Sequence, residues 1–197
     1  MTRNKILLIV GGAIVLIFAI FSMVSYNSLV KKQEKVKLQW NEIQNAYQRR
    51  LDLIPTLVTT IQGGANYEKD VLVKITEERA RAGAVIVNSS EPVATDYERQ
   101  TNAQNDLANV TNGGLKITIE KYPDIQGTKA YKNMLVDLEG TERRIKFARK
   151  DFNDAINDYN TSVRSFPTNL VAGLFGFKKR DGFAADSGAD KAKEIKF

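Results

Sequence analysis

The chain begins with a long apolar stretch and continues with apolar positions at helical spacing. Residues 6–24, "ILLIVGGAIVLIFAIFSMV", contain no charged residue and are polar only at Ser22. A helix of this length spans about 28 Å, close to the thickness of a bilayer's hydrocarbon core. We therefore predict a transmembrane anchor over 6–25, preceded by a short basic N-terminus over 1–5.

Two other interpretations of this stretch were weighed. A buried core helix would normally carry a polar stripe, which this one lacks. A cleaved signal peptide has a shorter apolar region, of about 7–15 residues, followed by a cleavage site of small residues. Here the stretch is followed by "SYNSLVKKQEKVK" (25–37) instead. We therefore favour an uncleaved anchor.

After the anchor, apolar residues recur every seven positions in two rows. The first row is Leu29, Val36, Ile43, Arg50 and Leu57, and the second is Gln33, Trp40, Tyr47, Ile54 and Ile61. Most of these positions are apolar, which predicts one amphipathic helix from about Tyr26 to Gln62. Gly63 and Gly64 then supply the backbone freedom that a reversal needs.

Two shorter helices are predicted in the middle of the chain. The first covers 66–87, and the turn "NSSEP" (88–92) follows it. The second covers 95–120 and opens with Thr95 and Glu98, which have the spacing of a capping box.

The end of the helix predicted over 95–120 is less regular. Gly113 and Gly114 each cost a helix about 1 kcal/mol. A strand over 115–122, "LKITIEKY", is an alternative to the helix there. Pro123 ends the segment, because the residue before a proline is pushed out of helical geometry.

The most regular pattern lies in the last third of the chain. Six residues stand seven apart without a break: Tyr131, Leu138, Ile145, Phe152, Tyr159 and Phe166. They predict a long helix over 128–164 that closes at Pro167. The chain is therefore predicted to be all-α, with an N-terminal transmembrane helix and an up-and-down four-helix bundle over 26–166, whose first and last helices are long.

An apolar segment with a basic flank follows the predicted bundle, over 167–180. Because the fourth helix runs back toward the anchor, this segment arrives beside the bilayer, where it can rest in the headgroup region. The alternative is that it folds against the bundle or covers a subunit seam. The predicted membrane-proximal residues are Lys31, Lys32, Leu170, Val171, Leu174, Phe175 and Phe177. Residues 181–197 are predicted to form a flexible tail.

The orientation of the anchor is nearly balanced by charge. Arg3 and Lys5 precede the apolar stretch, and four lysines follow it within 31–37. Short basic N-termini usually stay in the cytoplasm, which favours an extracytoplasmic body, whereas the lysines after the anchor argue for the opposite.

Composition excludes several kinds of chemistry. The chain has no cysteine and no histidine, which removes thiol catalysis, disulfides, the commonest general base and the commonest zinc ligand. The net charge of +6 arises from basic residues that are interspersed with acidic ones rather than gathered in one stripe. We predict no enzymatic activity, no cofactor, no metal site and no nucleic-acid partner.

Two residues interrupt the pattern of the first long helix. Pro55 removes an N–H from the helix and leaves the Leu51 carbonyl unbonded. This proline either kinks the helix around the bundle or creates a polar contact point for another subunit. Arg50 occupies a position where an apolar residue was due, and a buried arginine needs a carboxylate partner. The candidates are Asp52, Glu139 and Glu142.

The unequal helix lengths predict a surface for self-association. Near the membrane, the shorter inner helices would leave a seam of the long helices uncovered, which favours contacts with further copies. The predicted residues are Leu29, Val36, Trp40, Arg50, Phe152, Tyr159 and Phe166. On this hypothesis, Trp40→Glu breaks self-association and leaves the helical content nearly intact.

Several blocks of the chain resemble the LemA family of bacterial membrane proteins. They are "YNSLV" (26–30), "RRLDLIPTLV" (49–58), "YEKDVLVKITEERARA" (67–82), "EKYPDI" (120–125), "TERRIKFARKDFNDAINDYN" (141–160) and "FPTNLVAGLFGF" (166–177). The chain departs from the family pattern at Thr56 and Tyr67. The resemblance implies a four-helix, up-and-down bundle on a single anchor, and it brings no catalytic motif.

Two functional hypotheses remain. The first is a non-enzymatic, membrane-anchored scaffold whose partners are the lipid bilayer and further copies of itself, forming a homo-oligomer that organises or shapes the bacterial membrane. The alternative is a membrane-tethered adaptor that binds another membrane protein, such as a protease or its substrate.

Overall fold

The regular secondary structure of the described residues is entirely helical. The computed structural model describes residues 3–62, 69–87 and 92–183. Within them it contains five α-helices and one short 3-10 helix, and no strand. The all-α prediction is confirmed for this part of the chain. The predicted turns at Gly63–Gly64 and at 88–91 lie outside the described residues.

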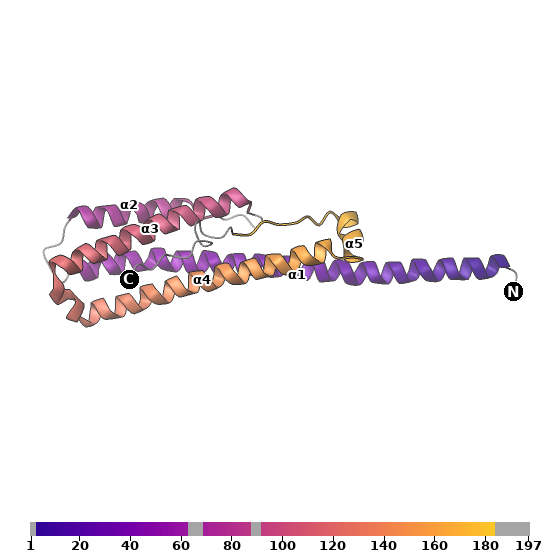
Figure 1. Ribbon diagram of the computed structural model, residues 1–197, viewed down its shortest axis with the longest axis horizontal. Helices are drawn as coiled ribbons and strands as arrows, with labels where there is room; N and C mark the ends of the chain where they lie inside the picture. The colour runs from indigo at the N-terminus through magenta and orange to yellow at the C-terminus, as the bar shows by residue number, and fades with distance from the viewer. Residues whose placement is uncertain (1–2, 63–68, 88–91, 184–197) are drawn as a thin grey trace, which may run out of the picture.

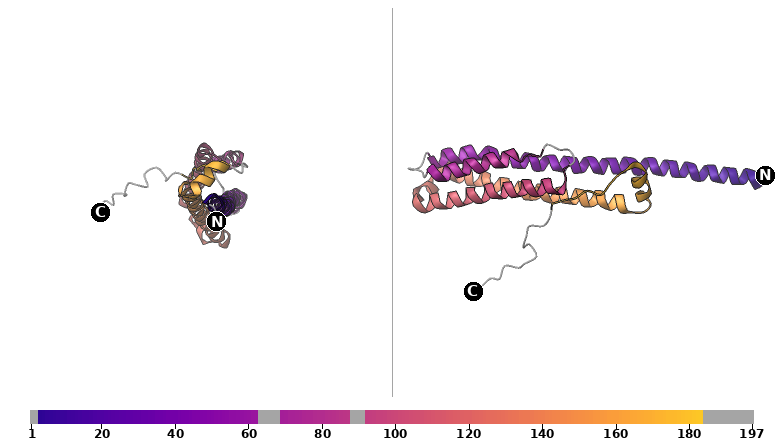
Figure 2. Two further views of the ribbon diagram at one scale, coloured as in Figure 1. Left: turned by 90° about the vertical axis from the view of Figure 1, so that its right-hand side faces the viewer. Right: turned by 90° about the horizontal axis from the view of Figure 1, so that it is seen from above.

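The helices form two antiparallel pairs. Their bounds are α1 Arg3–Gln62, α2 Lys69–Ala84, α3 Ala94–Lys121, η1 Pro123–Gly127, α4 Lys129–Arg164 and α5 Thr168–Phe175. Helix α1 runs the length of the molecule, and α4 returns beside its second half (Figure 1). Helices α2 and α3 pack on each other over the same half, and η1 links α3 to α4 (Figure 2).

Helix α1 is continuous from the apolar stretch into the body of the molecule. We predicted an anchor over 6–25 followed by an amphipathic helix from about Tyr26, and the structure has one helix over both, because 25–28 contain no proline or glycine to break it. Residues 7–20 are all exposed, and the helix is long and apolar enough in this part to cross a membrane. This exposed stretch is consistent with a membrane anchor.

The seven-residue rows of α1 form the core, as predicted. Nine of the ten row positions are buried, and Gln33 is half-buried. They contribute to two clusters. One is rich in aromatic side chains and includes Trp40, Tyr97 and Phe152. The other is aliphatic, lies toward the η1 end and includes Leu57 and Leu107.

Gly114 allows α2 and α3 to pack closely. A β-carbon there would stand 2.8 Å from Cγ1 of Val71 and 3.0 Å from Cδ1 of Ile75. The close approach of α2 therefore requires a glycine here. This packing offsets the local cost of Gly114 in a helix of 28 residues. The alternative of a strand over 115–122 is wrong, because α3 continues to Lys121.

The start of α3 differs from the predicted capping box. The helix begins at Ala94, and the Asp96 carboxylate accepts a hydrogen bond from the Val93 backbone N–H at 3.2 Å. Thr95 and Glu98 are both exposed. An aspartate three residues after the cap performs the task that we assigned to Glu98.

The Leu51 carbonyl that Pro55 leaves unbonded is used within the chain. It accepts a hydrogen bond from Nε of Arg79 on α2, at 2.9 Å. The idea that this carbonyl forms a contact point for another subunit is therefore wrong. Proline on α1 instead creates an acceptor that joins α1 to α2.

Candidate functional site

Helix α5 lies where the apolar stretch of α1 ends. It runs across the long axis of α1 and packs against both α1 and α4 (Figures 1 and 2). Val171 and Ala172, on the inner side of α5, are buried. The Tyr26 ring of α1 contacts the rings of Phe175 and Phe177, with centroids 5.0 and 5.6 Å away. These contacts fix α5 to α1 next to the anchor.

The outward side of α5 is apolar. Leu170, Leu174 and Phe175 are exposed, Leu174 to 70%, and Phe166 just before the helix is 79% exposed. Lys178 and Lys179 follow and are exposed. A helix with apolar side chains on its solvent side and cations behind it has the composition of an interfacial segment.

The predicted membrane-proximal residues divide into two groups. Leu170, Leu174, Phe175 and Lys31 are exposed at this end of the molecule, and their contact with lipid stays a prediction. The other three face the protein. Val171 is buried, Phe177 is half-buried against Tyr26, and Lys32 forms an ion pair with Asp158 at 2.6 Å. The prediction is wrong for Val171, because α5 uses that side chain to pack on the body.

Residues 176–183, which we call the strap, run back from α5 along α4. Two asparagines of α4 hold the backbone of the strap. Asn160 accepts a hydrogen bond from the Arg180 N–H and donates one to its carbonyl, at 2.9 and 2.7 Å. Asn153 does the same with Phe183, at 2.9 and 3.3 Å. The two amides stand two turns apart on one face of α4, so they pair with an extended segment.

Phe183 at the end of the strap completes the aromatic cluster. Its ring centroid lies 5.1 Å from that of Tyr97, 5.5 Å from Phe152 and 6.2 Å from Trp40. The Arg149 guanidinium lies 4.8 Å from the Phe183 centroid, in the geometry of a cation–π contact.

Burial raises the pKa of the Tyr97 phenol to about 12.

The strap covers the seam that we predicted to be open. The five apolar residues of α1 and α4 that define that seam are no more than 2% exposed: Leu29, Val36, Trp40, Phe152 and Tyr159. The expectation that they face further copies is wrong, because the chain itself buries them: Phe183 of the strap and Tyr97 of α3 pack on Trp40 and Phe152. The predicted tail also begins too early, since Phe183 is buried, while 184–197 lie outside the described residues.

Phe166, the remaining apolar residue predicted for self-association, is not covered. It is exposed because α4 ends at Arg164, so this last position of the seven-residue pattern lies two residues beyond the end of the helix. Its side chain lies at the α5 end of the molecule.

Arg50 is buried and paired within the chain. It is 5% exposed, and its Nη2 forms an ion pair with Glu142, one of the three carboxylates that we predicted as partners. Its Nη1 donates to the carbonyl oxygen and to Oε1 of Gln104 on α3, at 3.0 and 3.1 Å. Arg50 therefore links α1, α3 and α4, and the prediction that it faces a second copy is wrong.

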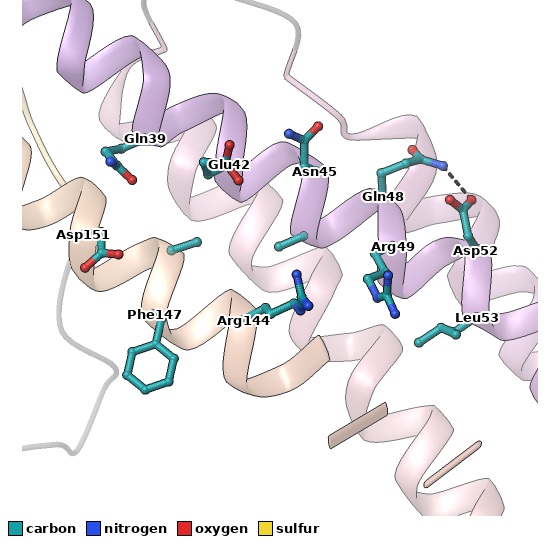
Figure 3. A pocket seen from close by; sticks show the side chains of 12 residues that line it. Gln39, Glu42, Asn45, Gln48, Arg49, Asp52, Leu53, Arg144, Phe147 and Asp151 are labelled. Carbon is teal, nitrogen blue, oxygen red and sulfur yellow. Dashed lines mark hydrogen bonds between the residues drawn. The ribbon is translucent and has the colours of Figure 1, made fainter. Parts of the chain in front are cut away.

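A second open surface lies between α1 and α4, and we call it the outer groove. It has a volume of about 720 Å³ and is lined by Glu42, Arg49, Arg144, Phe147 and Asp151, among others. Ala46 and Ala148 also line it, which keeps it shallow between the two helices. Phe147 is 60% exposed at its edge. Figure 3 shows these side chains on the two helices.

Charge is segregated along the outer groove. Because α1 and α4 are antiparallel, Glu42 and Asp151 share the end toward the anchor, while Arg49 and Arg144 share the other end (Figure 3). Within 3–62, 69–87 and 92–183, none of these four side chains forms an ion pair. Asp52 also lines the arginine end, where its carboxylate accepts a hydrogen bond from Gln48, so two positive charges face one negative charge there. Both ends still carry a net charge that can meet charges from outside the chain.

The strap residues were missed by sequence reasoning. Phe183 is a single aromatic in the polar run "KKRDGFAADSG", so no periodicity marks it. Asn153 and Asn160 carry a weak signal, because they are seven apart and each directly follows a buried row position of α4. Two amides at that spacing on one helix face could have indicated hydrogen bonds to the backbone of an extended segment.

The described residues gather no cluster of three carboxylates that could hold a metal ion. The predictions that the protein has no cofactor and no enzymatic activity remain predictions. What the geometry defines is an all-helical protein with one helix able to cross a membrane, an apolar helix beside it and an uncovered groove. These are features of a membrane-associated helical protein.

The chain belongs to the LemA family, whose model matches residues 39–197. This confirms the resemblance seen in the sequence. The family is recognised over the body of the molecule, the strap included, so the match covers most of the chain.

Named relatives are known from several bacteria. The chain is 26% identical over 146 residues to Protein LemA of Metamycoplasma hominis, covering 74% of this chain and 63% of that relative. It is 24% identical over 203 residues to Magnetosome protein MamQ 2 of Paramagnetospirillum magneticum, covering 93% and 74%. It is 23% identical over 180 residues to Magnetosome protein MamQ of Magnetospirillum gryphiswaldense, covering 82% and 65%. The chain thus spans less than two thirds of the LemA relative, and none of these names denotes an enzyme.

Proposed function

We propose that the protein is a non-enzymatic, membrane-anchored scaffold that self-associates and thereby organises or shapes the bacterial membrane. We interpret its body as an up-and-down four-helix bundle, and we place that body outside the cytoplasm. The observation that carries the proposal is α5, a helix with an exposed apolar side at the end of the anchor. A second attachment beside the anchor would hold the body at a fixed angle to the bilayer.

The energy of such an attachment is considerable. Burying one large apolar side chain stabilises an interaction by about 1.5–3 kcal/mol, and α5 offers Leu170, Leu174 and Phe175. Each lysine near an anionic bilayer surface adds about 1 kcal/mol, and Lys178 and Lys179 are exposed there. The contacts of α5 with α1 and α4 already orient it, so little of this free energy is spent on ordering the helix.

The absence of cysteine makes a direct test possible. A single fluorophore on the variant Leu174→Cys in lipid vesicles should be quenched by lipids that carry a spin label at the headgroup. The matched control is Lys132→Cys, an exposed site near the opposite end of α4, whose fluorophore should not be quenched. Equal quenching at the two sites would contradict contact between α5 and the bilayer.

For self-association, the outer groove is the best-supported surface. Two copies that meet groove to groove in antiparallel orientation place Glu42 and Asp151 of one copy opposite Arg49 and Arg144 of the other. Two parallel copies would place like charges together, which costs free energy. The groove therefore suits copies that stand on facing bilayers. Ala46 lies about 32 Å beyond the apolar stretch, so the two surfaces would be roughly 60 Å apart.

A charge exchange tests this pairing. One variant carries Arg49→Glu with Arg144→Glu, and the other carries Glu42→Lys with Asp151→Lys. We expect vesicles bearing the wild-type protein to cluster at low salt, vesicles bearing either variant alone to stay dispersed, and a mixture of the two variants to cluster. Electron cryomicroscopy should measure the spacing between clustered bilayers.

Three results would contradict the pairing through the outer groove: dispersed wild-type vesicles, unchanged clustering by either variant, or failure of the mixture. If wild-type vesicles stay dispersed while a crosslinker on Phe147→Cys captures a different protein in cells, the adaptor hypothesis replaces the scaffold. Phe147 is exposed at the edge of the groove, so its replacement should not disturb the core.

A further inference from the structure

The opposite face of the molecule carries a groove between α3 and α4, with α1 as its floor. Two adjoining hollows make up this groove, of about 500 and 600 Å³, and both are lined by Arg50, Glu142 and Arg143. Each hollow lies within the size range of small-molecule sites. The Arg50–Glu142 ion pair marks the boundary between them.

The two halves differ in chemistry. The smaller half is largely apolar, with Ile54 on its floor and leucines from both walls: Leu115, Leu135 and Leu138. The larger half is cationic, with Arg143, Lys146, Arg149 and Lys150 on α4. In the described part of the chain, Arg143 and Lys146 form no ion pair. One end of the groove thus suits a hydrocarbon and the other an anion.

Buried polar atoms on the α1 floor and the α3 wall of the groove lack hydrogen-bond partners. Nε of Arg50 and Nε2 of Gln104 have none in the described structure, although these residues are only 5% and 1% exposed. The Thr111 hydroxyl, on a residue 4% exposed, also has none. Arg50 and Gln104 line the cationic half, and Thr111 lines the apolar half. Each of these atoms has less than 1 Å² of accessible surface, so a ligand oxygen reaches one of them only after a neighbouring side chain turns aside. Burying unpaired donors costs free energy, and a ligand with acceptor oxygens would then recover it.

We propose that the α3–α4 groove binds a small anionic amphiphile, with its headgroup at Arg50 and Gln104 and its single hydrocarbon chain among the leucines. A carboxylate or a phosphate monoester meets the same donors, so the shared chemistry is an anionic oxygen group on an alkyl chain. Arg50 lies about 39 Å along α1 from the end of the apolar stretch, so a lipid within the bilayer does not reach it. The ligand arrives as a free molecule. This proposal does not depend on the scaffold function.

Octyl phosphate and octanoate are suitable probes, since both are water-soluble. They are titrated into the full-length protein in nanodiscs of neutral lipid, and the heat of empty nanodiscs is subtracted. We expect saturable binding of at least one probe, and the tighter one identifies the headgroup. Lengthening its chain should tighten binding roughly fourfold per methylene. Octyl glucoside and inorganic phosphate should bind far more weakly, since each lacks one half of the recognised structure.

The matched variants are Arg143→Glu with Lys146→Glu in the groove, and Lys132→Glu with Lys129→Glu outside it. All four residues are exposed on α4, so both pairs should keep the wild-type circular dichroism. We expect the groove pair to weaken binding at least tenfold and the outside pair to change it less than twofold. The proposal is overturned by the absence of saturable binding, by equal binding of octyl glucoside or inorganic phosphate, or by equal losses in both pairs.

Discussion

Trp40→Glu is expected to unfold the body of the protein rather than to separate one copy from another. The side chain is buried among Tyr97, Phe152 and Phe183, with ring centroids between 5.2 and 6.2 Å away. Truncating a buried tryptophan costs about 3–5 kcal/mol, and an unpaired buried carboxylate adds to that. The total is comparable with the whole free energy of unfolding of many domains, about 5–15 kcal/mol.

Thermal unfolding followed by circular dichroism measures this effect. The matched control is Leu38→Glu, which introduces the same charge two residues earlier on the exposed side of α1. We expect the control to unfold within a few degrees of the wild type and Trp40→Glu to lose its cooperative transition. If Trp40→Glu melted like the control, the aromatic cluster would not be a core, and a role between copies would return.

Phe183→Ala is expected to release the strap while the helices stay folded. Removing a buried phenylalanine costs about 3–5 kcal/mol, and here the loss falls on a segment held otherwise by hydrogen bonds from Asn153 and Asn160. Each of those bonds contributes only about 1 kcal/mol. The other end of the strap keeps the ring contact of Phe177 with Tyr26 and the hydrogen bond from the Tyr159 hydroxyl to the Lys178 carbonyl. The end around Phe183 has too little left to stay bound, and Trp40 becomes accessible to water.

The single tryptophan reports this release directly. Trp40 emission should shift to the red in Phe183→Ala, and the amide protons of the strap should exchange faster, while those of α4 stay protected. Phe147→Ala is the control, since it removes the same side chain from an exposed position on α4. Unchanged emission in Phe183→Ala would show that the strap is held by contacts other than this ring.

The helices were predictable because their periodicity is long and regular. The rows on α1 and α4 span five and six repeats, and burial on one face of a helix imposes that spacing on the sequence. Both ends of α3 and α4 were predicted to within one residue, and so was the end of α1 at Gln62. Local patterning therefore determines which face of each long helix is covered.

Periodicity does not tell what covers that face. We assumed that the short inner helices leave the seam around Trp40 and Phe152 open, and inferred a second copy. The covering element is an extended strap, whose contacts are hydrogen bonds to its backbone and two aromatic rings, Phe177 and Phe183. Such a segment has no period of its own. All of the predicted self-association residues except the exposed Phe166 are therefore buried inside the chain instead of forming an interface.

The Arg50 prediction succeeded for a different reason. A charge in an apolar row must be compensated, and Glu142 was among the few carboxylates on the helix that packs there. The same reasoning could not find Gln104, because a glutamine on α3 is chemically ordinary until its neighbours are known.

The unbroken course of α1 makes the protein a lever. No hinge separates the apolar stretch from the body, so a tilt of the helix within the lipid is transmitted to the far end. The part of α1 beyond residue 25 is about 56 Å long, and a tilt of about 20° would displace its tip by roughly 19 Å. Bilayers of different thickness impose different tilts, so the position of the η1 end would respond to the thickness of the membrane that holds it.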